Sequence, residues 1–448
     1  MKPQRQSTFT RNVLPRNQCA CRVFTTNLIA GVVARGNVTP CAAGAARQLW
    51  NPMSHSPAAS SIPCVVCGSP NTVPLIEILD APVDTIRLWR TPADACSAPR
   101  AQIGITYCEE CGHLFNGYYN DLVTYETDYE NSQMFSPRFR RYAEELSDRL
   151  ITTYKLQQKD IVEIGGGRGD FLRILCERGK NRGISFDPSY RPAPGEDVPA
   201  NVRFVTDHYT AKHADVPASL IICRHVLEHF WRPRSLIETV RRAVGDRKDL
   251  VVYFEVPNGE FILREQAFWE FIYQHPSYFT QSSLAKLFTM CGFQIRAIRE
   301  SFGSQVLEIE ASVESELSDR SWPHEANAAT ALLARGLAGS FREKLVSWRD
   351  TLNRLNAQGR RVVAWGAGAK ATTFLNLVDP AGSAISHVVD INPRKTGRFV
   401  PGTGQRIIEP DELRELRPHV IILMNELYRE EITSQTAGLG IYPEFLAA

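Results

Sequence analysis

The pattern of apolar and polar positions predicts alternating strands and helices from residue 126 onward. Apolar side chains recur at helical spacing at Phe139, Tyr142, Ala143, Leu146 and Leu150, which indicates an amphipathic helix. Short apolar runs then predict buried strands at Asp160–Gly165, Gly183–Asp187, Val202–Thr206, Ser219–Arg224 and Leu250–Val256. Helix-compatible segments such as Phe171–Arg178 and Arg234–Val244 separate them. This alternation predicts a parallel, doubly wound α/β sheet, which binds ligands at the carboxyl ends of its strands.

A second unit of the same kind is expected in residues 316–448. It begins with a long helical stretch, and Val362-Val-Ala-Trp-Gly366 then repeats the succession of strand, glycine turn and helix. We see no short-period repeat and no coiled coil. The chain is therefore divided into four regions, residues 1–57, 58–125, 126–315 and 316–448.

The first region, residues 1–57, differs in composition from the rest. No acidic residue precedes Glu77, while arginines are scattered among Ser, Thr, Asn and Ala. A basic, acid-free stretch is typical of an organellar transit peptide. We favour a simpler interpretation, a disordered basic extension or a start assigned too early, because Met53-Ser-His-Ser-Pro leads directly into the first cysteine pair.

The bulk composition is ordinary for a globular protein. At 448 residues the chain is too long for one core, and roughly two to three domains are expected. A formal net charge of +2 gives no electrostatic reason to expect nucleic acid or an anionic membrane as a partner. No apolar run is long enough to span a bilayer. We expect a small-molecule substrate, and the sequence leaves monomer and homodimer open.

Cysteine usage favours a reducing compartment. The chain has 11 cysteines, and an odd number does not suit a secreted disulfide framework. Cys176, Cys223 and Cys291 stand alone inside apolar segments, where a cysteine behaves as a small buried hydrophobe. A cytoplasmic location is therefore the expectation.

Two cysteine pairs in residues 58–125 predict a metal site. Cys64-x-x-Cys67 and Cys108-x-x-Cys111 have the spacing that lets two thiolates of one tight turn reach one zinc ion. Gly68 and Gly112 follow the second cysteine of each pair, where the chain must turn through positive φ. The alternatives are unrelated buried cysteines or a redox pair. Since four thiolates leave no open coordination position, the site is expected to be structural.

The glycine-rich turn after the first central strand predicts a cofactor pocket. Glu163-Ile-Gly165-Gly-Gly167-Arg-Gly-Asp170 brings the backbone close to a ligand, and Asp187, which ends the next strand, is expected to accept the ribose hydroxyls. A dinucleotide fingerprint needs a small residue at position 170, where this chain has Asp170. The departure favours S-adenosylmethionine, which has no pyrophosphate for a helix N-terminus to hold.

Two further residues are expected beside this cofactor. Asp207 follows the strand Val202–Thr206 and is placed to meet the adenine amino group. Arg224 ends the strand Ser219–Arg224, where side chains face the pocket.

Taken together, these motifs resemble those of the bacterial sugar-nucleotide C-methyltransferases, over roughly residues 62–445. The resemblance rests on the paired cysteines, Tyr129-Glu-Asn-Ser132, the central glycine turn, Leu227-Glu-His229, Phe271-Ile-Tyr-Gln-His-Pro-Ser-Tyr-Phe279, Gly366-Ala-Gly-Ala-Lys370, Asp390-Ile-Asn-Pro-Arg-Lys-Thr-Gly397 and Val400-Pro-Gly-Thr403. It implies an N-terminal zinc-binding module, a class I (Rossmann-like) methyltransferase domain and a second Rossmann-like C-terminal domain.

The resemblance also implies a reaction, methylation of a carbon next to a ketone in a nucleotide-linked keto-deoxysugar. This chemistry needs a base for the α proton and donors for the enolate oxygen. His275 matches the family's base and His229 a second active-site histidine. Tyr273, Tyr129 and Ser132 are candidates for contacts to the enolate oxygen or the sugar hydroxyls.

One departure concerns the residue before the base. The family carries Glu there, where this chain has Gln274. A glutamine can orient the imidazole ring but cannot raise its basicity by charge. Gln274 is therefore placed among the substrate-binding residues, and a different acceptor stays open.

The second glycine turn leaves three alternatives open. Gly366-Ala-Gly368-Ala-Lys370-Ala371, followed by Asp390 at the end of the next strand, fits a nucleotide fingerprint and by itself would suggest NAD. Lys370 and the helix N-terminus could instead bind the diphosphate of a sugar nucleotide. The third alternative is a fold kept for packing.

Three functions therefore compete. The leading hypothesis is the S-adenosylmethionine-dependent C-methyltransferase of a nucleotide-linked keto sugar. The second is a methyltransferase for another small acceptor, such as a natural-product carbonyl or hydroxyl. The third is an NAD-binding oxidoreductase or scaffold built on the second glycine turn.

Overall fold

The computed structural model describes residues 50–52, 62–120, 122–123, 129–192, 195, 197–313 and 326–448, all within one compact unit that spans Thr39–Ala448. The expectations for residues 1–49 and 53–57, including the transit peptide and the role of Met53, lie outside the described residues. Trp50–Pro52 of the expected extension form strand β1, which pairs with β2 (Thr72–Pro82). The outer edge of β2 offers unpaired backbone groups that a short strand can satisfy.

The cysteine-bearing region forms an antiparallel sheet, which we call the front sheet. Its strand order is β1-β2-β3-β4-β10, with β3 at Arg100–Cys108, β4 at Leu114–Asn116 and β10 at Ser277–Tyr278. Helix α1 (Pro92–Cys96) lies between β2 and β3 in the chain. Strand β10 comes from the region predicted as 126–315, so this sheet is completed by a segment from beyond the expected boundary.

The central region forms a seven-stranded sheet of order β11-β12-β9-β8-β5-β6-β7. The strands are β5 (Asp160–Ile164), β6 (Arg182–Phe186), β7 (Val202–Val205), β8 (Leu220–Arg224), β9 (Val251–Pro257), β11 (Gln294–Ser301) and β12 (Val306–Ser312). Strands β5 to β9 run parallel, and β12 is antiparallel to both its neighbours. The strand order reverses at β5, so the loops after β5 and β8 flank the topological switch point, where open α/β sheets bind ligands.

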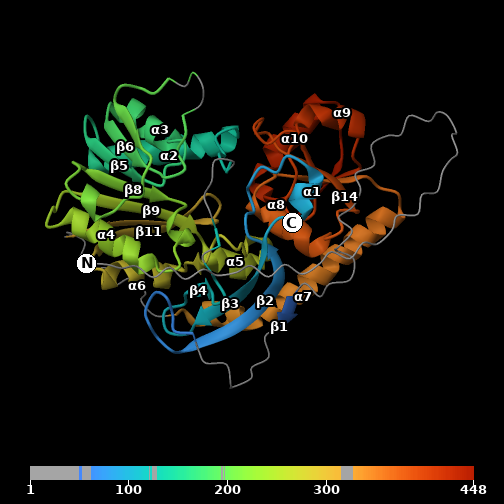
Figure 1. Ribbon diagram of the computed structural model, residues 1–448, viewed down its shortest axis with the longest axis horizontal. Coiled ribbons are helices and arrows are strands. Elements are labelled where there is room, and N and C mark those ends of the chain that lie inside the picture. The colour runs from blue at the N-terminus through green and yellow to red at the C-terminus, as the bar shows by residue number, and fades with distance from the viewer. Residues whose placement is uncertain are drawn as a thin grey trace, which may run out of the picture. The chain divides into compact units, whose positions relative to one another are not determined.

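Helices cover both faces of this sheet (Figure 1). Helices α2 (Pro137–Tyr154) and α3 (Asp170–Gly179) pack on one face, and α4 (Pro233–Val244) and α6 (Gln281–Met290) on the other. The predicted amphipathic helix is α2, which begins at the cap Ser136 followed by Pro137 and buries Leu146 and Leu150. Helix α5 (Gly259–Glu265) follows β9.

The C-terminal region repeats the plan with a five-stranded parallel sheet of order β15-β14-β13-β16-β17. Its strands are β13 (Val362–Trp365), β14 (Ile385–Val389), β15 (Arg406–Ile408), β16 (Val420–Leu423) and β17 (Glu444–Ala447). Its helices are α7 (Ala328–Ala357), α8 (Ala369–Val378), α9 (Leu413–Leu416) and α10 (Arg429–Gly438). The predicted α/β class is confirmed: the C-terminal sheet is parallel, and the central sheet has a parallel part, β5 to β9, that β12 extends as an antiparallel strand.

The front sheet and the C-terminal region share one hydrophobic core. Ile103 and Ile105 of β3 belong to the same buried cluster as Phe268, Phe341 of α7 and Phe374 of α8. The expected boundary at 125/126 therefore separates neither sheets nor cores, because β10 joins the sheet of residues 58–125. The boundary at 315/316 falls within residues 314–325, which are not described. Within the described residues, no helix combines the length and apolar character that a membrane span requires.

Candidate active site

The glycine turn between β5 and α3 is shaped by positive φ angles. Gly165, Gly167 and Gly169 have φ of 70°, 55° and 72°, a region that side chains other than glycine avoid. A Cβ added at Gly166 would overlap Glu163 Oε2 and Ser185 Oγ, whereas one at Gly167 would meet nothing within 4 Å. The turn is thus packed tightly against the sheet beneath and open at Gly167.

Glu163 supports this turn from below. Its side chain is buried, and Oε2 accepts a hydrogen bond of 2.9 Å from Ser185 Oγ. Burial raises the pKa of Glu163 to about 7, although the hydroxyl of Ser185 acts in the opposite direction.

Asp187 connects the end of β6 to the turn. Its Oδ2 accepts from Gly167 N at 2.7 Å, and its Oδ1 accepts from the backbone N and the Oγ of Ser189 at 2.7 and 2.6 Å. A carboxylate oxygen has two lone pairs, so these bonds fix the carboxylate and leave acceptor capacity on Oδ2. In the part of the chain that the structure describes, no salt bridge involves Asp187.

Asp170 and Asp207 have protein partners of their own. Asp170 begins α3 and accepts a hydrogen bond of 2.9 Å from Ser132 Oγ, which ties the Tyr129–Ser132 segment to the cofactor side. Asp207 is exposed, accepts from His208 N at 2.8 Å and pairs with Lys212. An exposed pair of this kind contributes little stability, so it would yield readily to an adenine amino group.

Arg224 is buried and lies under the same turn. It pairs with the fully buried Glu255, and its guanidinium lies 4.2 Å from the ring centroid of Phe171, near the start of α3. Among the described residues its Nη2 has no hydrogen-bond partner. The sequence predicted contact with the cofactor; the structure shows that Arg224 also neutralises a buried carboxylate.

His229 and His275 meet on the side of β8 and β9. Their ring centroids are 4.7 Å apart with the rings nearly perpendicular, and with Glu228 they form a cluster whose nitrogen and oxygen atoms lie within 4.8 Å of one another. His229 Nδ1 lies 2.8 Å from the carbonyl oxygen of Gln274. Because a carbonyl only accepts, Nδ1 carries the hydrogen, and in the neutral ring Nε2 carries the lone pair.

The imidazole of His275 is held neutral. Burial and then the charge of His229 lower its pKa to about 3, while Glu228 acts in the opposite direction. A neutral imidazole has the lone pair that a general base requires.

Tyr129 lies within electrostatic range of both Asp187 and Glu228. Burial raises the pKa of its hydroxyl, followed by the negative charges of Glu228 and Asp187. A protonated hydroxyl in this position can donate a hydrogen bond to an oxygen bound between the two sites.

Tyr273 and Gln274 point toward the front sheet instead. Tyr273 is buried, donates to Asn120 O at 2.6 Å and accepts from Asn120 N at 3.1 Å. Gln274 is buried, and its Oε1 accepts from Thr85 N at 3.0 Å and from Thr85 Oγ1 at 2.5 Å. In this conformation the proton of the Tyr273 hydroxyl is donated to Asn120 O, and the contact to the enolate oxygen that the sequence suggested stays a prediction.

Lys370 brings the C-terminal region to the histidine cluster. Its Nζ lies 2.5 Å from Oε1 of the buried Glu270 and 3.1 Å from Gln305 Oε1, and its charge contributes to lowering the pKa of His275. Lys370 therefore lies within electrostatic range of His275, while its ammonium group is paired with Glu270.

The second glycine turn has the same hydrogen bonds as the first but one additional cation. Asp390 accepts from Ala367 N and Asn392 N, both at 2.8 Å, as Asp187 does from Gly167 and Ser189. Lys395 Nζ, however, lies 3.1 Å from Asp390 Oδ2. This internal ion pair engages a carboxylate oxygen that would otherwise be available to a ribose hydroxyl, which argues against NAD at the C-terminal turn.

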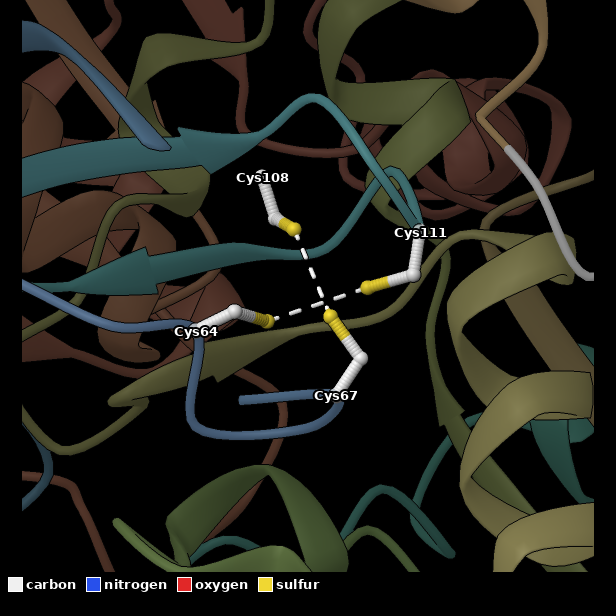
Figure 2. A group of neighbouring side chains, drawn as sticks. All are labelled: Cys64, Cys67, Cys108 and Cys111. Carbon is white, nitrogen blue, oxygen red and sulfur yellow. Dashed lines mark hydrogen bonds between the residues drawn. The ribbon is translucent and has the colours of Figure 1, made fainter. Parts of the chain in front are cut away.

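The four predicted zinc ligands converge (Figure 2). Cys64 Sγ lies 3.7 Å from Cys111 Sγ, and Cys67 Sγ lies 3.6 Å from Cys108 Sγ. Sulfurs at the corners of a tetrahedron, each about 2.3 Å from a central zinc ion, would lie about 3.8 Å apart. Gly68 and Gly112 have φ of 77° and 76°, as the tight turns require. The residues present therefore fit a four-thiolate zinc site.

Two residues of the site were given no role by the sequence analysis. Glu228 stands inside the Leu227-Glu-His229 motif, and His225 lies just before it with φ of 54°, an unusual value for a histidine. The sequence signal for these two residues was an acidic residue flanked by two histidines, directly after a strand at the switch point.

Two family models match the chain. One, described as a methyltransferase domain, matches residues 134–298, and the other, described as a C-methyltransferase C-terminal domain, matches residues 335–440. The two matched domains, taken together, fit the C-methyltransferase family. With the matched central domain, this makes the protein an S-adenosylmethionine-dependent methyltransferase, as predicted.

Individual relatives of this C-methyltransferase are distant. The C-methyltransferase NovU of Streptomyces niveus is 22% identical over 315 residues, which cover 65% of this chain and 72% of NovU. Similar solved structures include CalO1, a methyltransferase in calicheamicin biosynthesis, in the SAH-bound form (17% identity, TM-score 0.29, 40% of this chain and 56% of CalO1). Another is the magnesium protoporphyrin IX methyltransferase ChlM of Synechocystis PCC 6803 with bound SAH (14% identity, TM-score 0.30, 39% of this chain and 84% of ChlM).

Proposed function

We propose that this enzyme methylates the carbon next to the ketone of a nucleotide-linked keto-deoxysugar, through an enolate that His275 generates. The sugar substrate follows from the motif resemblance described above. The structural observation that supports it is the electrostatic influence of side chains from two chain regions on one cluster. Tyr129 precedes α2, His229 and His275 come from the central region, and Lys370 comes from the C-terminal region.

The cofactor side is formed by the switch point of the central sheet. Asp187 would accept the ribose hydroxyls through the acceptor capacity left on its carboxylate, and Asp207 would accept from the adenine amino group. Glu163, Gly165, Gly167 and Asp170 would shape the turn, and Arg224 Nη2 would serve as a donor for the cofactor carboxylate. The bound S-adenosylmethionine supplies an electrophilic methyl group and leaves as S-adenosylhomocysteine.

On the substrate side, the reaction begins with a proton transfer. The neutral imidazole of His275 takes the α proton, and the electron pair of the broken C–H bond stays on the substrate as an enolate. A positioned general base contributes roughly 10²–10⁴ in rate. The imidazolium then returns the proton to water after the new carbon–carbon bond has formed.

The remaining polar groups would hold the substrate. The protonated hydroxyl of Tyr129 is suited to donate to the enolate oxygen, and Ser132 lies beside it in the chain. Lys370, in the first turn of α8, would bind the diphosphate. Gln274 and Tyr273 would act by holding the His275 loop against the front sheet.

Zinc completes the proposal as a structural ion held by Cys64, Cys67, Cys108 and Cys111. The spacing of the sulfur atoms supports it, and a four-thiolate site has no open position for substrate.

The experiment that tests this function supplies methyl-¹³C S-adenosylmethionine and a panel of thymidine- and cytidine-linked 4-keto sugars. We expect one of them to gain a ¹³C-methyl group bonded to carbon, visible as a carbon–carbon coupling or correlation in the NMR spectrum of the product. Transfer to oxygen, or to unrelated carbonyl or hydroxyl metabolites and to none of the sugars, would contradict the sugar assignment and favour the second hypothesis.

A further inference from the structure

The absence of a carboxylate at position 274 leaves open how this enzyme stabilises a protonated His275. The family motif places Glu beside the base, and this chain has Gln274. The structure shows that Gln274 is fixed by both of its bonds to Thr85 on the front-sheet side. Charge support for His275 must therefore come from another residue.

Glu228 is a buried carboxylate in the same cluster. It lies in the 3₁₀ turn Leu227–His229 directly after β8 and is only 1% exposed. Its Oε1 is 3.7 Å from His225 Nδ1, and its Oε2 has no hydrogen-bond partner within the described part of the chain. Burying a carboxylate with an unpaired oxygen costs stability. This cost favours a role for Glu228 in the reaction.

The groups around Glu228 are mainly histidines. His229 and His275 lie with it inside the 4.8 Å cluster. Burial raises the pKa of Glu228, but His225, His229 and His275 outweigh burial and hold it below its usual value. The carboxylate is therefore ionised when His275 has to accept a proton. The charge of Lys370 from α8 also acts on His275, and the charge of Glu228 raises the pKa values of Tyr129 and Cys223.

We infer that Glu228 is the positioning residue for His275 and supplies the negative charge that Gln274 lacks. Its negative charge lies beside the imidazole and stabilises the imidazolium that forms when His275 removes the α proton. A charge a few ångströms away in a site shielded from water interacts far more strongly than at the surface. The role of Glu228 in proton transfer rests on the proposed function. Its electrostatic interaction with His275 does not.

The first test measures the basicity of His275 without a substrate. Diethyl pyrocarbonate acylates neutral imidazole, and its rate at His275, followed by peptide mass spectrometry at pH 7, rises with the basicity of the ring. In Glu228→Gln we expect this rate to fall about threefold or more, since a neighbouring opposite charge shifts a pKa by ~1 unit or more. Glu228→Asp, which restores the charge, should recover most of the rate.

A purely structural role for Glu228 predicts the opposite change in the acylation rate of His275. If Glu228 only supported the fold, Glu228→Gln would loosen the loop, speed acylation and lower the melting temperature. We expect the melting temperature to stay the same or rise, because an unpaired buried carboxylate has been removed. Faster or unchanged acylation would overturn the inference. A second metal ion in the wild-type protein that Glu228→Gln loses would also overturn it, by making the cluster a metal site.

The second test uses the sugar that the methylation panel identifies. In Glu228→Gln we expect kcat to fall at least about tenfold, with KM and S-adenosylhomocysteine affinity within twofold of wild type. If no sugar is methylated by the wild-type enzyme but acylation slows as expected, the proposed substrate fails and the role of Glu228 stands. If the sugar is methylated and kcat of Glu228→Gln equals that of wild type, the function stands and the role of Glu228 fails.

Discussion

Two aspartates at equivalent positions, Asp187 and Asp390, have different surroundings. Each ends the second strand of a parallel sheet and accepts from the glycine turn beside it. Lys395 pairs with Asp390, whereas no salt bridge involves Asp187 among the described residues. Asp187, the carboxylate without a salt bridge, is therefore the one that can accept hydrogen bonds from the hydroxyls of a nucleoside.

The first prediction compares these two residues. Asp187→Asn should weaken binding of S-adenosylhomocysteine by at least about tenfold, since a hydrogen bond to a charged group contributes roughly 1.5–3 kcal/mol. Asp390→Asn is the matched control, and its affinity should stay within twofold of wild type. Isothermal titration calorimetry measures both. Equal losses in the two variants would contradict the assignment of the cofactor to the central turn.

The second prediction concerns the base. His275→Asn keeps a polar side chain of similar size but cannot accept the proton, so methyl transfer should fall about 10²–10⁴-fold. Affinity for S-adenosylhomocysteine should stay within twofold, because His275 lies outside the glycine turn. A calorimetric loss of cofactor binding would instead give His275 a structural role.

At the scale of elements, the cysteine site supports the active-site loop. Strand β10 begins two residues after His275 and pairs with β4, and Asn116 N donates to Pro276 O at 2.9 Å. Ser282 Oγ at the start of α6 donates to Cys111 O at 2.9 Å. The cysteine site and the loop that carries His275 thus belong to one hydrogen-bonded assembly.

The third prediction follows from this connection. The purified protein should contain one zinc ion per chain, and a chelator should lower its melting temperature and methyl transfer, because structural thiolate sites contribute folding free energy. Cofactor affinity should change less, since Asp187 and the glycine turn lie on the central sheet. Elemental analysis measures the zinc content, thermal unfolding the melting temperature and calorimetry the cofactor affinity. A zinc-free protein with wild-type stability would contradict the structural role.

The sequence predicted the regular elements better than the contacts between them. Apolar runs located β5 and β8 to within a residue or two, because a buried parallel strand has a continuous apolar pattern. Strand β10 has only two residues, Ser277 and Tyr278, and no periodicity. The side chain of Gln274 is oriented by Thr85, far away in sequence. Such contacts depend on tertiary packing, which a single sequence does not reveal.

At the scale of the whole molecule, the described regions are joined by a common core and by polar contacts. Phe341 of α7 packs against Phe268 with ring centroids 5.5 Å apart, and both belong to the cluster that includes β2, β3 and the C-terminal sheet. Gln305 and Asn425 exchange two amide hydrogen bonds of 2.9 and 2.8 Å. The front sheet and the C-terminal region should therefore unfold together.

The fourth prediction tests this cooperativity. Phe341→Ala should lower the free energy of unfolding by about 3–5 kcal/mol, as expected for a large core side chain. Val346→Ala on the same helix is the control, because Val346 is 50% exposed, and it should change stability by less than about 0.5 kcal/mol. Denaturant unfolding gives the free energies, and zinc release followed in the same titration should coincide with unfolding in Phe341→Ala. Zinc release well separated from unfolding would contradict a shared core.

The generation of an enolate by His275 is tested most directly by hydrogen exchange at the substrate carbon. The enzyme is incubated in D₂O with the keto sugar and S-adenosylhomocysteine, which occupies the cofactor site but has no methyl group to transfer. The account predicts deuterium at the carbon next to the ketone, at a rate reduced about 10²–10⁴-fold in His275→Asn. Exchange that is as fast in His275→Asn as in the wild-type enzyme, or no exchange with a sugar that the enzyme methylates, would contradict it.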